Sequence, residues 1–505
     1  MKVLRQLLEG ISCSWNGKGE LTTPIAAVRS DSRKVKLGDL FVAIPGFNVD
    51  GYQFIADAIQ RGAKAVVAER FDRIVGERGI PQFVVSDSRT ALACLVASAY
   101  DFPARKLKLI GITGTNGKTT TSFLIQYLLN AKSHAGLIGS IWYDDGKTKM
   151  AADNTTPPAE VLQETLAKMV NHGMSYCVME VSSHALDQSR TSDLLFSSAV
   201  FTNLTQDHLD YHHDFEAYYK AKRRLFLCEA PPRHSIINCD DSYGARLWKE
   251  FQNQDTAVSY GVRAPYHYLA RQIKIKWDGL VFELLCRNKS WQVRTPLTLG
   301  HNVYNALAAL SAVSEEGFPI EDLLLSLSQF PGVPGRMERI DEGQDFYVFV
   351  DYAHTPDGLF NVLSSVSELP KNRVISVFGC GGDRDRGKRS IMGEIANRFS
   401  DLVILTSDNP RSEDPEDILS EIKKGINPSS GKAKLLVVPD REEAIRQAIE
   451  TAESGDVVFI FGKGHETYQI LGKQKVPFSD QSVVRHWLKI RCSTSAKSQK
   501  LAVEN

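Results

Sequence analysis

A glycine-rich segment has the residue types of a phosphate-binding loop. It reads Gly111-Ile-Thr-Gly-Thr-Asn-Gly-Lys-Thr-Thr120, between an apolar run and a helix-like run. Glycines let backbone N–H groups approach phosphate oxygens, and a helix N-terminus adds positive potential. Lys118 can reach the terminal phosphates and Thr119 can bind Mg²⁺, whereas a plain glycine turn before an exposed lysine is the alternative. The residues expected to bind ATP are Gly114, Thr115, Asn116, Gly117, Lys118, Thr119 and Thr120.

A bound nucleotide needs a carboxylate for its metal ion. Glu180 interrupts an apolar run, where a buried charge is costly without a cation, although a glutamate at a strand end can also face solvent. The segment Thr202–His213 places three histidines and two aspartates within seven residues. It could suggest zinc, but no H-E-x-x-H pattern or cysteine accompanies it, so Mg²⁺ is favoured.

Two other reactive residue types have ordinary interpretations. The basic run Lys220–Arg224 is typical of a solvated helix face. Cys380 has no base nearby in the sequence and is interpreted as a small buried thiol. The eight cysteines show no C-x-x-C pair, which indicates reduced thiols in a cytoplasmic protein.

Apolar runs that alternate with amphipathic stretches must position these residues. This alternation predicts an α/β protein with parallel sheets covered by helices. Each run leads into a loop rich in polar residues or glycine, and ligands of such sheets bind at the carboxyl ends of the strands. The clearest runs are 108–112, 177–181, 373–378, 402–405 and 457–461.

Two proline-containing stretches suggest joints between domains. They are 100–106 and 330–336, the second of which follows an expected long helical segment from about His301 to Gln329. We therefore expect three domains, and 505 residues are enough for three. The boundaries are 1–105 for the N-terminal domain, 106–332 for the central P-loop domain, 333–493 for the C-terminal Rossmann-like domain and 494–505 for a flexible tail.

The overall charge excludes several classes of partner. Sixty basic and sixty acidic residues give a formal net charge of +0, so the chain lacks the basic excess typical of nucleic-acid or membrane-surface binding. Neither a signal peptide nor a membrane span is expected. We expect a monomer in the cytoplasm whose partners are small molecules.

With these residues in view, the chain resembles the Mur ligase family, the ATP-dependent amide ligases that assemble the peptide of bacterial cell-wall precursors. The motifs occur in order: Thr113–Thr119, Glu180, the T-N-x-x-x-D-H-L-D element with His208, and His301-Asn-x-x-Asn305. The C-terminal block adds Gly335-Arg-Met-Glu338 and Asp351-Tyr-Ala-His-Thr-Pro356. The resemblance implies a central doubly wound, mostly parallel sheet. It also implies that Asn302, Arg336 and Asp351 hold the base, phosphate and ribose of ATP.

Within the family, the N-terminal block resembles the uridine-nucleotide-binding domain of the ligases that add the third amino acid. Asp31-Ser-Arg33 and Gly38–Val42 carry this likeness, and the Gly46–Gly51 loop is expected beside them. Without the resemblance, Asn154–Pro158 would be interpreted only as a turn. The residues that the resemblance assigns to the UDP-muramoyl-dipeptide are Ser30, Ser32, Asn154, Thr155, Thr156, Ser182, Gln188 and Arg190.

The resemblance also changes the interpretation of one lysine. Lys222 aligns with a lysine that is carbamylated in this family and helps to bind a second Mg²⁺. Carbamylation turns a cation into an anionic oxygen ligand, which suits a hard metal ion. The catalytic residues are then Lys118, Glu180, His208 and Lys222, and the implied metal ligands are Thr119, Glu180, His208 and the carbamate of Lys222.

Ser407-Asp-Asn-Pro-Arg411 matches the family's acceptor motif in its D-N-P-R form. meso-Diaminopimelate carries a carboxylate beside its distal amine, and the guanidinium fork of Arg411 suits it. L-Lysine would leave that guanidinium unpaired. On residue types alone, this segment would be a turn with an exposed arginine. The residues that the resemblance assigns to diaminopimelate are Arg384, Asp408, Asn409, Pro410, Arg411, Gly462 and Glu466.

The implied reaction is ATP-dependent and needs no protein nucleophile. The γ-carboxylate of D-glutamate in UDP-N-acetylmuramoyl-L-alanyl-D-glutamate would become an acyl phosphate, which the amine of meso-diaminopimelate attacks. Positioning and cations would supply the catalysis. The alternatives are the same ligation with L-lysine and, in a different class, a P-loop ATPase that acts as a switch or transporter.

Overall fold

A computed structural model describes residues 1–46, 49–227, 230–367, 369–427 and 433–503, with backbone only for 494–503. The expected Gly46–Gly51 loop and Cys228 therefore fall partly or wholly outside the described residues. Contacts divide the chain into two compact units. Unit 1 contains 1–271, 284–290 and 304–327, and unit 2 contains 272–283, 291–303 and 328–505. The three predicted domain boundaries stay predictions.

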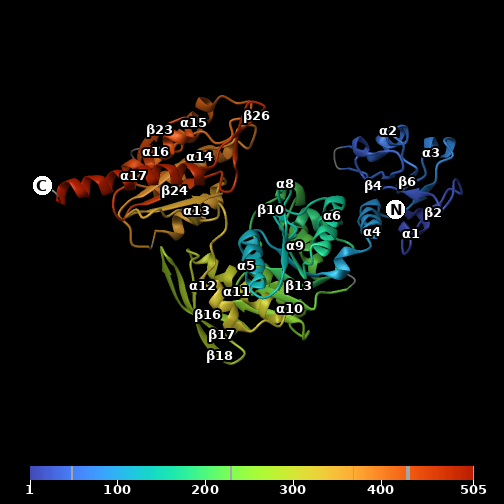
Figure 1. Cartoon of the computed structure of the whole chain (residues 1–505), viewed down its shortest axis with the longest axis horizontal. Coiled ribbons are helices and arrows are strands. Elements are labelled where there is room, and N and C mark those ends of the chain that lie inside the picture. Colours follow the sequence, from blue (N-terminus) through green and yellow to red (C-terminus); the bar gives the residue numbers. More distant parts are fainter. Residues whose placement is uncertain (47–48, 228–229, 368, 428–432, 504–505) are drawn as a thin grey trace. The chain divides into compact units, whose positions relative to one another are not determined.

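The N-terminal part of unit 1 is built on a five-stranded sheet of order β2-β7-β6-β5-β4 (Figure 1). β4 to β7 are parallel, and β2 is antiparallel to β7. β1 and β3 pair separately. The strands are β1 Lys2–Val3, β2 Ser14–Trp15, β3 Pro24–Ile25, β4 Val28–Arg29, β5 Leu40–Val42, β6 Ala65–Ala68 and β7 Gln82–Val84, and the helices are α1 Leu4–Leu7, η1 Ser32–Lys34, η2 Gly51–Phe54, α2 Ile55–Gln60, α3 Arg73–Glu77 and α4 Ser88–Ala99.

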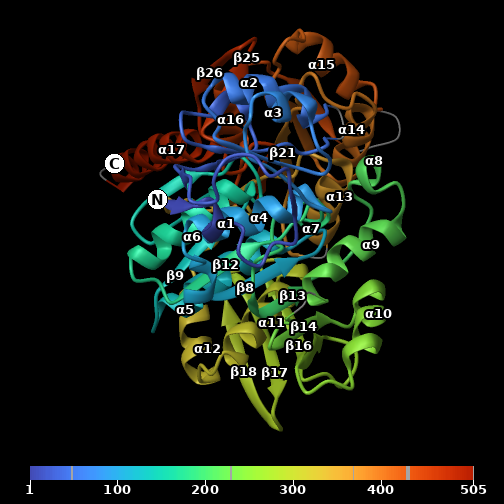
Figure 2. The same ribbon diagram turned by 90° about the vertical axis from the view of Figure 1, so that its right-hand side faces the viewer.

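A larger sheet of order β11-β10-β9-β12-β8-β13-β14-β15-β16-β17-β18 contains the phosphate loop. Its strands run parallel from β9 to β16, as predicted for a doubly wound sheet. Figure 2 shows β8, β12 and β13 side by side. The strands are β8 Lys108–Thr113, β9 Ala135–Ile138, β10 Trp142–Asp144, β11 Lys149–Ala151, β12 Tyr176–Glu180, β13 Phe196–Phe201, β14 His234–Asn238, β15 Ala257–Gly261, β16 Tyr268–Lys276, β17 Gly279–Cys286 and β18 Lys289–Thr295.

Helices cover this central sheet, and several of them begin at a side-chain cap. Asp214 accepts a hydrogen bond from Ala217 N–H at the start of α9, and Asp241 caps α10 in the same way. The helices are η3 Pro103–Lys106, α5 Lys118–Asn130, α6 Ala159–Asn171, α7 Ser183–Asp187, α8 Leu209–His212, α9 Phe215–Arg223, η4 Arg224–Phe226, α10 Ser242–Phe251, α11 His301–Glu315 and α12 Ile320–Ser328.

The expected single helical segment from His301 to Gln329 is wrong, because the structure contains two helices there. α11 ends at Glu315 and α12 begins at Ile320. Gly317 between them has a φ of +99°, which favours glycine, and Pro319 lacks the N–H that a continuous helix would need.

The C-terminal part of unit 2 is a six-stranded sheet of order β19-β20-β24-β21-β22-β23, parallel except for β19. The hairpin β25–β26 follows β24. The elements are β19 Glu338–Arg339, β20 Tyr347–Asp351, β21 Val374–Phe378, β22 Leu402–Leu405, β23 Lys434–Val437, β24 Val457–Phe461, β25 Tyr468–Leu471, β26 Gln474–Pro477, α13 Pro356–Ser365, α14 Gly387–Phe399, α15 Pro415–Lys423, α16 Arg441–Thr451 and α17 Asp480–Val503. α17 thus includes most of the expected tail, whose flexibility stays a prediction.

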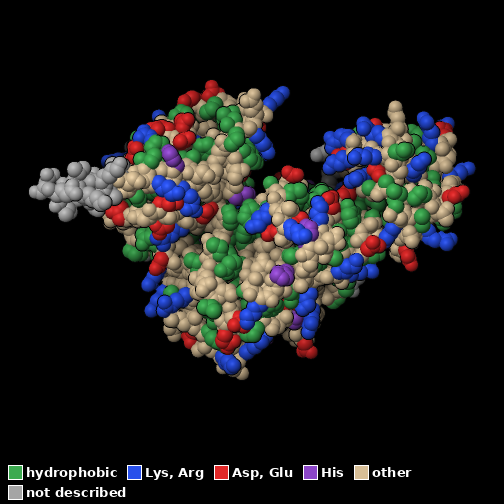
Figure 3. All heavy atoms as spheres, in the orientation of Figure 1, with side chains coloured by type: hydrophobic (Ala, Val, Ile, Leu, Met, Phe, Trp, Pro, Cys, Tyr) green, Lys and Arg blue, Asp and Glu red, His purple; other side chains and the backbone are tan. Residues whose placement is uncertain are grey.

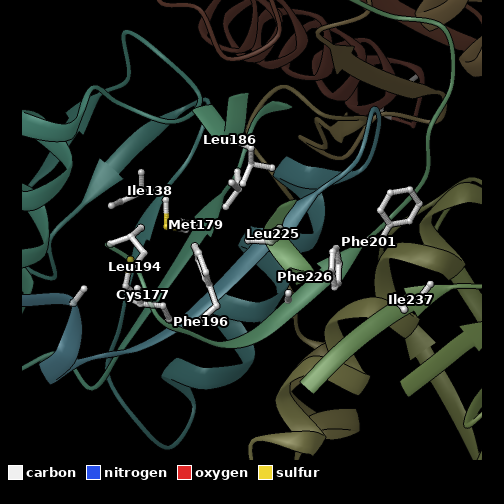
Figure 4. Close-up of a cluster of buried hydrophobic side chains, with 14 of the residues drawn as sticks. Ile138, Cys177, Met179, Leu186, Leu194, Phe196, Phe201, Leu225, Phe226 and Ile237 are labelled. Carbon is white, nitrogen blue, oxygen red and sulfur yellow. The ribbon is translucent and has the colours of Figure 1, made fainter. Parts of the chain in front are cut away.

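Apolar side chains from the strands and their covering helices form the cores. Figure 4 shows one core of the central sheet, where side chains from β12 and β13 meet those of η4. Met179, Phe201 and Phe226 in this cluster are fully buried. Polar side chains therefore concentrate at the strand ends, where the predicted site residues lie. On the face shown in Figure 3, basic and acidic side chains are interspersed, in keeping with the zero net charge.

Candidate functional site

The predicted phosphate loop connects β8 to α5 and depends on two glycine conformations. Gly114 has a φ of +151°, and a Cβ there would lie 1.8 Å from Thr202 Oγ1. Gly117 has a φ of +86° and immediately precedes α5, which begins at Lys118. Thr119 and Thr120 occupy the first turn of this helix. The predicted order of strand, glycine loop and helix is confirmed.

Side chains from neighbouring segments brace this loop. Lys118 Nζ donates to the carbonyl oxygens of Gly114 and Thr115, both at 2.8 Å. Asn116 N–H donates to Asn203 Oδ1 at 2.9 Å, and Asn203 Nδ2 donates back to the Asn116 carbonyl at 3.2 Å. Asn305, from the predicted His301-Asn-x-x-Asn305 motif, accepts from Thr121 Oγ1 at 3.3 Å. Asn203 thus orients the loop, a role that the sequence did not reveal.

Glu180 ends β12 and is fully buried, so the alternative of a solvent-facing glutamate is wrong. Its Oε2 accepts from Thr119 Oγ1 at 3.1 Å and from Ser140 Oγ at 3.0 Å, while Oε1 accepts from Ser140 N–H at 2.9 Å. The carboxylate therefore contacts the first turn of α5 and the loop after β9, and its partners in these contacts are neutral groups.

Lys222 on α9 is also buried, at 1% exposure. Its Nζ donates to Gly114 O at 2.8 Å, the carbonyl that also accepts from Lys118. Burial, together with repulsion by Lys118, lowers the pKa of the Lys222 ammonium well below its usual range. The interpretation of a solvated basic face is wrong for Lys222, although Lys220 and Arg224 are exposed.

His208 precedes α8 with a φ of +53° and lies close to this pair of lysines. Burial lowers the pKa of its imidazole and Asp207 opposes the shift, while Lys118 and Lys222 lower it further. Its ring packs edge-on against His184, with centroids 4.8 Å apart. The structure therefore brings the predicted catalytic residues of unit 1 to one end of the parallel strands.

The oxygen atoms at and around the Glu180 carboxylate suit a hard cation. A carboxylate flanked by the hydroxyl groups of Thr119 and Ser140 offers the oxygen ligands that Mg²⁺ prefers. Among the described residues, no three His, Cys, Asp or Glu side chains gather in an arrangement that could hold a metal ion. The preference for Mg²⁺ over zinc at Thr202–His213 stays a prediction.

Residues assigned to the muramoyl-dipeptide form a network next to Glu180. Thr156 Oγ1 donates to the Glu180 carbonyl at 2.8 Å and accepts from Ser182 N–H at 2.9 Å. Arg190 donates to Thr156 O at 2.8 Å and to Gln188 Oε1 at 2.7 Å. Thr155 Oγ1 lies 3.0 Å from Ser140 Oγ. Five of the eight predicted residues are thus brought together by the loops that hold the glutamate.

The other three lie around this network or in the N-terminal part. Asn154 has an exposed side chain, while its carbonyl accepts from Tyr143 Oη at 2.5 Å. Ser30 donates from N–H and Oγ to Glu160 Oε1, at 3.1 and 2.5 Å. Ser32 is buried at the start of η1. Asn154, Ser30 and Ser32 are therefore not hydrogen-bonded to the other predicted muramoyl-peptide residues.

Asn302, Arg336 and Asp351 lie in unit 2. Asp351 ends β20, and its carboxylate accepts from Met337 N–H at 2.7 Å and Ala353 N–H at 2.8 Å. Burial raises the pKa of this carboxyl, and the nearby Arg336 opposes the rise. The Arg336 guanidinium stacks 4.6 Å above the Tyr352 ring centroid. Asn302 Nδ2 donates to Thr298 O at 2.6 Å. The structure therefore places Arg336 beside Asp351 at a strand end.

The predicted acceptor motif follows β22 and is held against the loop after β21. Arg411 has a φ of +53°, and its Nη1 donates to Gly382 O at 2.8 Å. A Cβ on Gly382 would lie 1.9 Å from Pro410 O, so the two loops pass too closely for a larger residue. Arg411 N–H also donates to Ile470 O at 3.1 Å in the β25–β26 hairpin. Arg384 is exposed on the same loop as Gly382.

A buried arginine, which the sequence analysis did not identify, holds these two loops together. Arg389 is 0% exposed and donates to both oxygens of Glu413 at 2.9 Å and to Glu421 Oε2 at 2.8 Å. Glu413 Oε1 also accepts from Asp383 N–H at 2.6 Å. We call this set of contacts the clasp. The Arg389 guanidinium lowers the pKa of the Glu413 carboxyl to about 2.

The remaining acceptor residues form a compact polar group. Asp408 and Asn409 are each 6% exposed, and Asn409 Nδ2 donates to Glu466 Oε2 at 3.0 Å. Lys463, which was not predicted, lies fully buried among them. Gly462 has a φ of +113°, and a Cβ there would lie 2.7 Å from Asp408 Oδ2. Nearby, Cys380 is buried as expected, and burial raises the pKa of its thiol to about 12.

Other features that sequence reasoning missed share one signal. Ser140 and Asn203 follow β9 and β13, and Lys463 follows β24, so all lie just after apolar strands.

Among the described residues, no helix combines the length and apolar character needed to cross a bilayer.

Three family models match successive parts of the chain. Residues 24–100 match the model described as Mur ligase family, catalytic domain, and residues 112–313 match the Mur ligase middle domain. Residues 335–464 match the Mur ligase, glutamate ligase domain.

Curated relatives match nearly the whole chain. A UDP-N-acetylmuramoyl-L-alanyl-D-glutamate--2,6-diaminopimelate ligase from Geobacillus kaustophilus is 45% identical over 474 residues, covering 92% of this chain and 95% of the relative. A ligase of the same name from Clostridioides difficile is 42% identical over 487 residues, covering 96% and 99%.

Solved structures agree with this relationship. One with the same ligase name is 34% identical, with a TM-score of 0.71, covering 97% of this chain and 99% of that one. A MurF ligase from Thermotoga maritima in complex with ADP shares the fold, with a TM-score of 0.59 at 18% identity, covering 93% and 99%.

Proposed function

The chain belongs to the Mur ligase family, and on that premise we propose how its residues carry out the reaction. It is an ATP-dependent ligase of peptidoglycan precursor synthesis that joins meso-2,6-diaminopimelate to the D-glutamate γ-carboxylate of UDP-N-acetylmuramoyl-L-alanyl-D-glutamate. L-Lysine is not favoured as the acceptor, because the similar relatives are named for diaminopimelate. The observation that carries the proposed residue roles is that Ile470 of the β25–β26 hairpin joins Arg411 to Asn409, which in turn contacts the carboxylate of Glu466.

The phosphate site would activate the D-glutamate carboxylate. Lys118 and the N–H groups at the start of α5 are proposed to hold the ATP phosphates, so that the γ-phosphoryl group meets the carboxylate oxygen in line. The product of this step is an acyl phosphate, and ADP leaves. Thr156, Ser182, Gln188 and Arg190 would hold the muramoyl-dipeptide beside Glu180, since they are linked by hydrogen bonds.

Mg²⁺, when bound, would offset the negative charge that develops between the phosphates. Thr119, Glu180, His208 and a carbamate on Lys222 are the proposed ligands. The environment of Lys222 supports carbamylation, because the amine must lose its proton before it adds to CO₂. The buried site and the nearby Lys118 both favour the neutral amine.

Asn302, Arg336 and Asp351 are proposed to bind the base, phosphate and ribose of ATP. The Asp351 carboxylate is already oriented by two backbone N–H groups, which leaves its position fixed before the ribose arrives. Ser30 and Ser32 are proposed to contact the uridine nucleotide. A monomeric state and a cytoplasmic location are further proposals.

The acceptor loops would bind the amino acid. Arg411 and Arg384 are proposed to hold its distal carboxylate, and Asp408 and Glu466 the neighbouring ammonium group. The attacking amine, as the free base, then adds to the acyl phosphate carbonyl. Phosphate leaves and the nitrogen loses a proton, which completes the amide.

Phosphate release with each component omitted tests this reaction. A ligase releases phosphate appreciably only when ATP, the UDP-linked dipeptide and diaminopimelate are all present. Steady turnover with ATP alone would instead favour a P-loop switch or transport ATPase and would contradict the proposal.

The carbamate has its own test in Lys222→Arg. This change keeps a cation at the site, but arginine stays protonated and cannot be carbamylated. We expect kcat to fall by about 10²-fold or more, the range for a lost charge-stabilising group. An activity within about threefold of the wild type would show that a simple cation suffices.

A further inference from the structure

Lys463 lies between the predicted acceptor residues and has no assigned role. It follows β24 and is 0% exposed. Its Nζ lies 3.2 Å from Asn409 Oδ1, 3.2 Å from Glu466 Oε2 and 3.7 Å from Asp408 Oδ1. The first two contacts are hydrogen bonds that the ammonium donates, and the third, to the Asp408 carboxylate, is a longer ion pair. Lys463 therefore contacts three of the predicted acceptor residues.

The lysine also determines how Asn409 is oriented. Because an ammonium only donates, it requires the carbonyl end of the amide to face it. Asn409 Oδ1 accepts a second hydrogen bond from Ile470 N–H at 2.9 Å, which uses its other lone pair. The amide nitrogen then points to Glu466 Oε2, at 3.0 Å. With Oδ1 filled, Asn409 cannot accept from a substrate ammonium, and this function falls to Asp408 and Glu466.

The charges of these side chains also favour Asp408 and Glu466 as the groups that bind the substrate ammonium. Asp408 and Glu466 are anionic and Lys463 is cationic, so the group has one negative charge that is not compensated within it. One substrate ammonium would balance it. Without Lys463, two carboxylates would share a nearly buried site, and such like charges disfavour each other's ionised form. Gly462 keeps the space beside Asp408 Oδ2 open, because a Cβ there would lie 2.7 Å from that oxygen.

We propose that Lys463 is a positioning residue of the acceptor site. It fixes Asn409 and Glu466 and leaves a single negative charge for the ammonium group next to the carboxylate that Arg411 takes. This inference rests on the proposed function, since it names a determinant of the same amino-acid site.

Lys463→Met tests this proposal, because it keeps the side-chain length and removes the charge and donors. We expect KM for meso-diaminopimelate to rise about tenfold or more while kcat stays within about threefold, as for lost ground-state binding. KM for ATP and for the UDP-linked dipeptide should stay within about twofold. Lys475→Met is the matched control, because Lys475 is exposed on β26 and its Nζ lies 4.2 Å from the Tyr468 ring centroid. It should leave all three KM values unchanged.

A role in folding alone would reduce the melting temperature and the amount of active enzyme without selecting one substrate. Lys463→Met in a Glu466→Gln background separates positioning of the substrate from folding. This double variant removes the lysine cation and the Glu466 carboxylate together, so it can be tested even if Lys463→Met alone does not fold. There the KM for diaminopimelate should rise only about two- to fivefold, because one of the lysine's contacts is already lost. An unchanged KM in either background, or an equal rise in both, would overturn the proposal. If the wild type itself does not incorporate diaminopimelate, the proposed function fails instead.

Discussion

Lysines in the phosphate site donate to backbone carbonyls, whereas the buried cations of the acceptor site are surrounded by carboxylates. Lys118 and Lys222 both donate to Gly114 O. Lys463 instead contacts Glu466 and Asp408, and Arg389 contacts Glu413 and Glu421. Phosphates carry several negative charges, so a site for them gains from nearby cations. A zwitterionic amino acid is nearly neutral overall and suits a site where Lys463 compensates one of two carboxylates and one negative charge is left for the ammonium group.

The two sites should therefore respond differently to the loss of one cation. In the phosphate site, the loss removes stabilisation of the reacting groups and lowers kcat. In the acceptor site, the loss disturbs the partner carboxylates and raises KM for the amino acid. Substitutions of Lys118 and Arg411 test the phosphate site and the acceptor site in turn.

Lys118→Met should have the largest effect. Because its ammonium is proposed to offset phosphate charge in the transition state, we expect ligation to fall about 10³-fold, or about 4 kcal/mol. Phosphate release with all three substrates measures the change. Lys132→Met, which changes an exposed lysine on the Asn130–Ser133 turn, is the control and should retain activity. A loss confined to KM for the amino acid would break the contrast.

Arg411→Ala should reduce kcat/KM for diaminopimelate by about 10²-fold, or about 3 kcal/mol for a lost charge-assisted contact. The KM for ATP should not change, since the two sites bind different substrates. Arg398→Ala removes an exposed arginine on α14 of the same unit and serves as the control. Kinetics equal to those of the wild type would remove Arg411 from the acceptor site.

Fold and site differ in how far the sequence could predict them. The strand runs at 402–405 and 457–461 were found because a buried parallel strand is apolar along its whole length. The phosphate loop was found for a similar reason, since its glycines, lysine and threonine are adjacent in sequence. Such local patterns need no knowledge of which segments meet.

The features that were missed depend on contacts between distant segments. Lys463 and Asn409 are 54 residues apart, and Arg389 and Glu413 are 24 apart. A lysine between two glycines is typical of an exposed turn, and only the fold shows that this one is buried. The overlong helix has a different cause, because the Gly317–Pro319 break was outweighed by the helical periodicity on both sides of it.

Glu413→Gln sharpens the contrast within the acceptor site itself. Glu413 and Glu421 bind the same buried Arg389, but only Glu413 also accepts from Asp383 N–H. We expect KM for diaminopimelate to rise about tenfold in Glu413→Gln and less than about threefold in Glu421→Gln. Steady-state kinetics of both variants at saturating ATP measure the two KM values. Equal effects would mean that the clasp stabilises unit 2 without orienting the loops.

Lowering the pH should weaken the clasp, with only a small effect on the free energy of unfolding. The Glu413 carboxyl has a folded-state pKa lowered from 4.5 to about 2 by Arg389, so its stabilisation is present above pH 4.5 and is lost as the pH falls toward 2. Between pH 5 and 3 we expect Glu413→Gln to lose less stability than the wild type, by under about 1 kcal/mol because the pair is partly solvent-screened. Urea unfolding at both pH values measures this difference, and parallel curves would contradict it.

Competition between two acceptors shows whether the Arg411 site prefers diaminopimelate. Equal concentrations of meso-diaminopimelate and L-lysine are supplied with ATP and UDP-N-acetylmuramoyl-L-alanyl-D-glutamate, and the two tripeptide products are separated by mass. We expect the diaminopimelate product to exceed the lysine product by about 10²-fold or more, because lysine leaves Arg411 without a carboxylate. Comparable amounts of both products, or an excess of the lysine product, would contradict it.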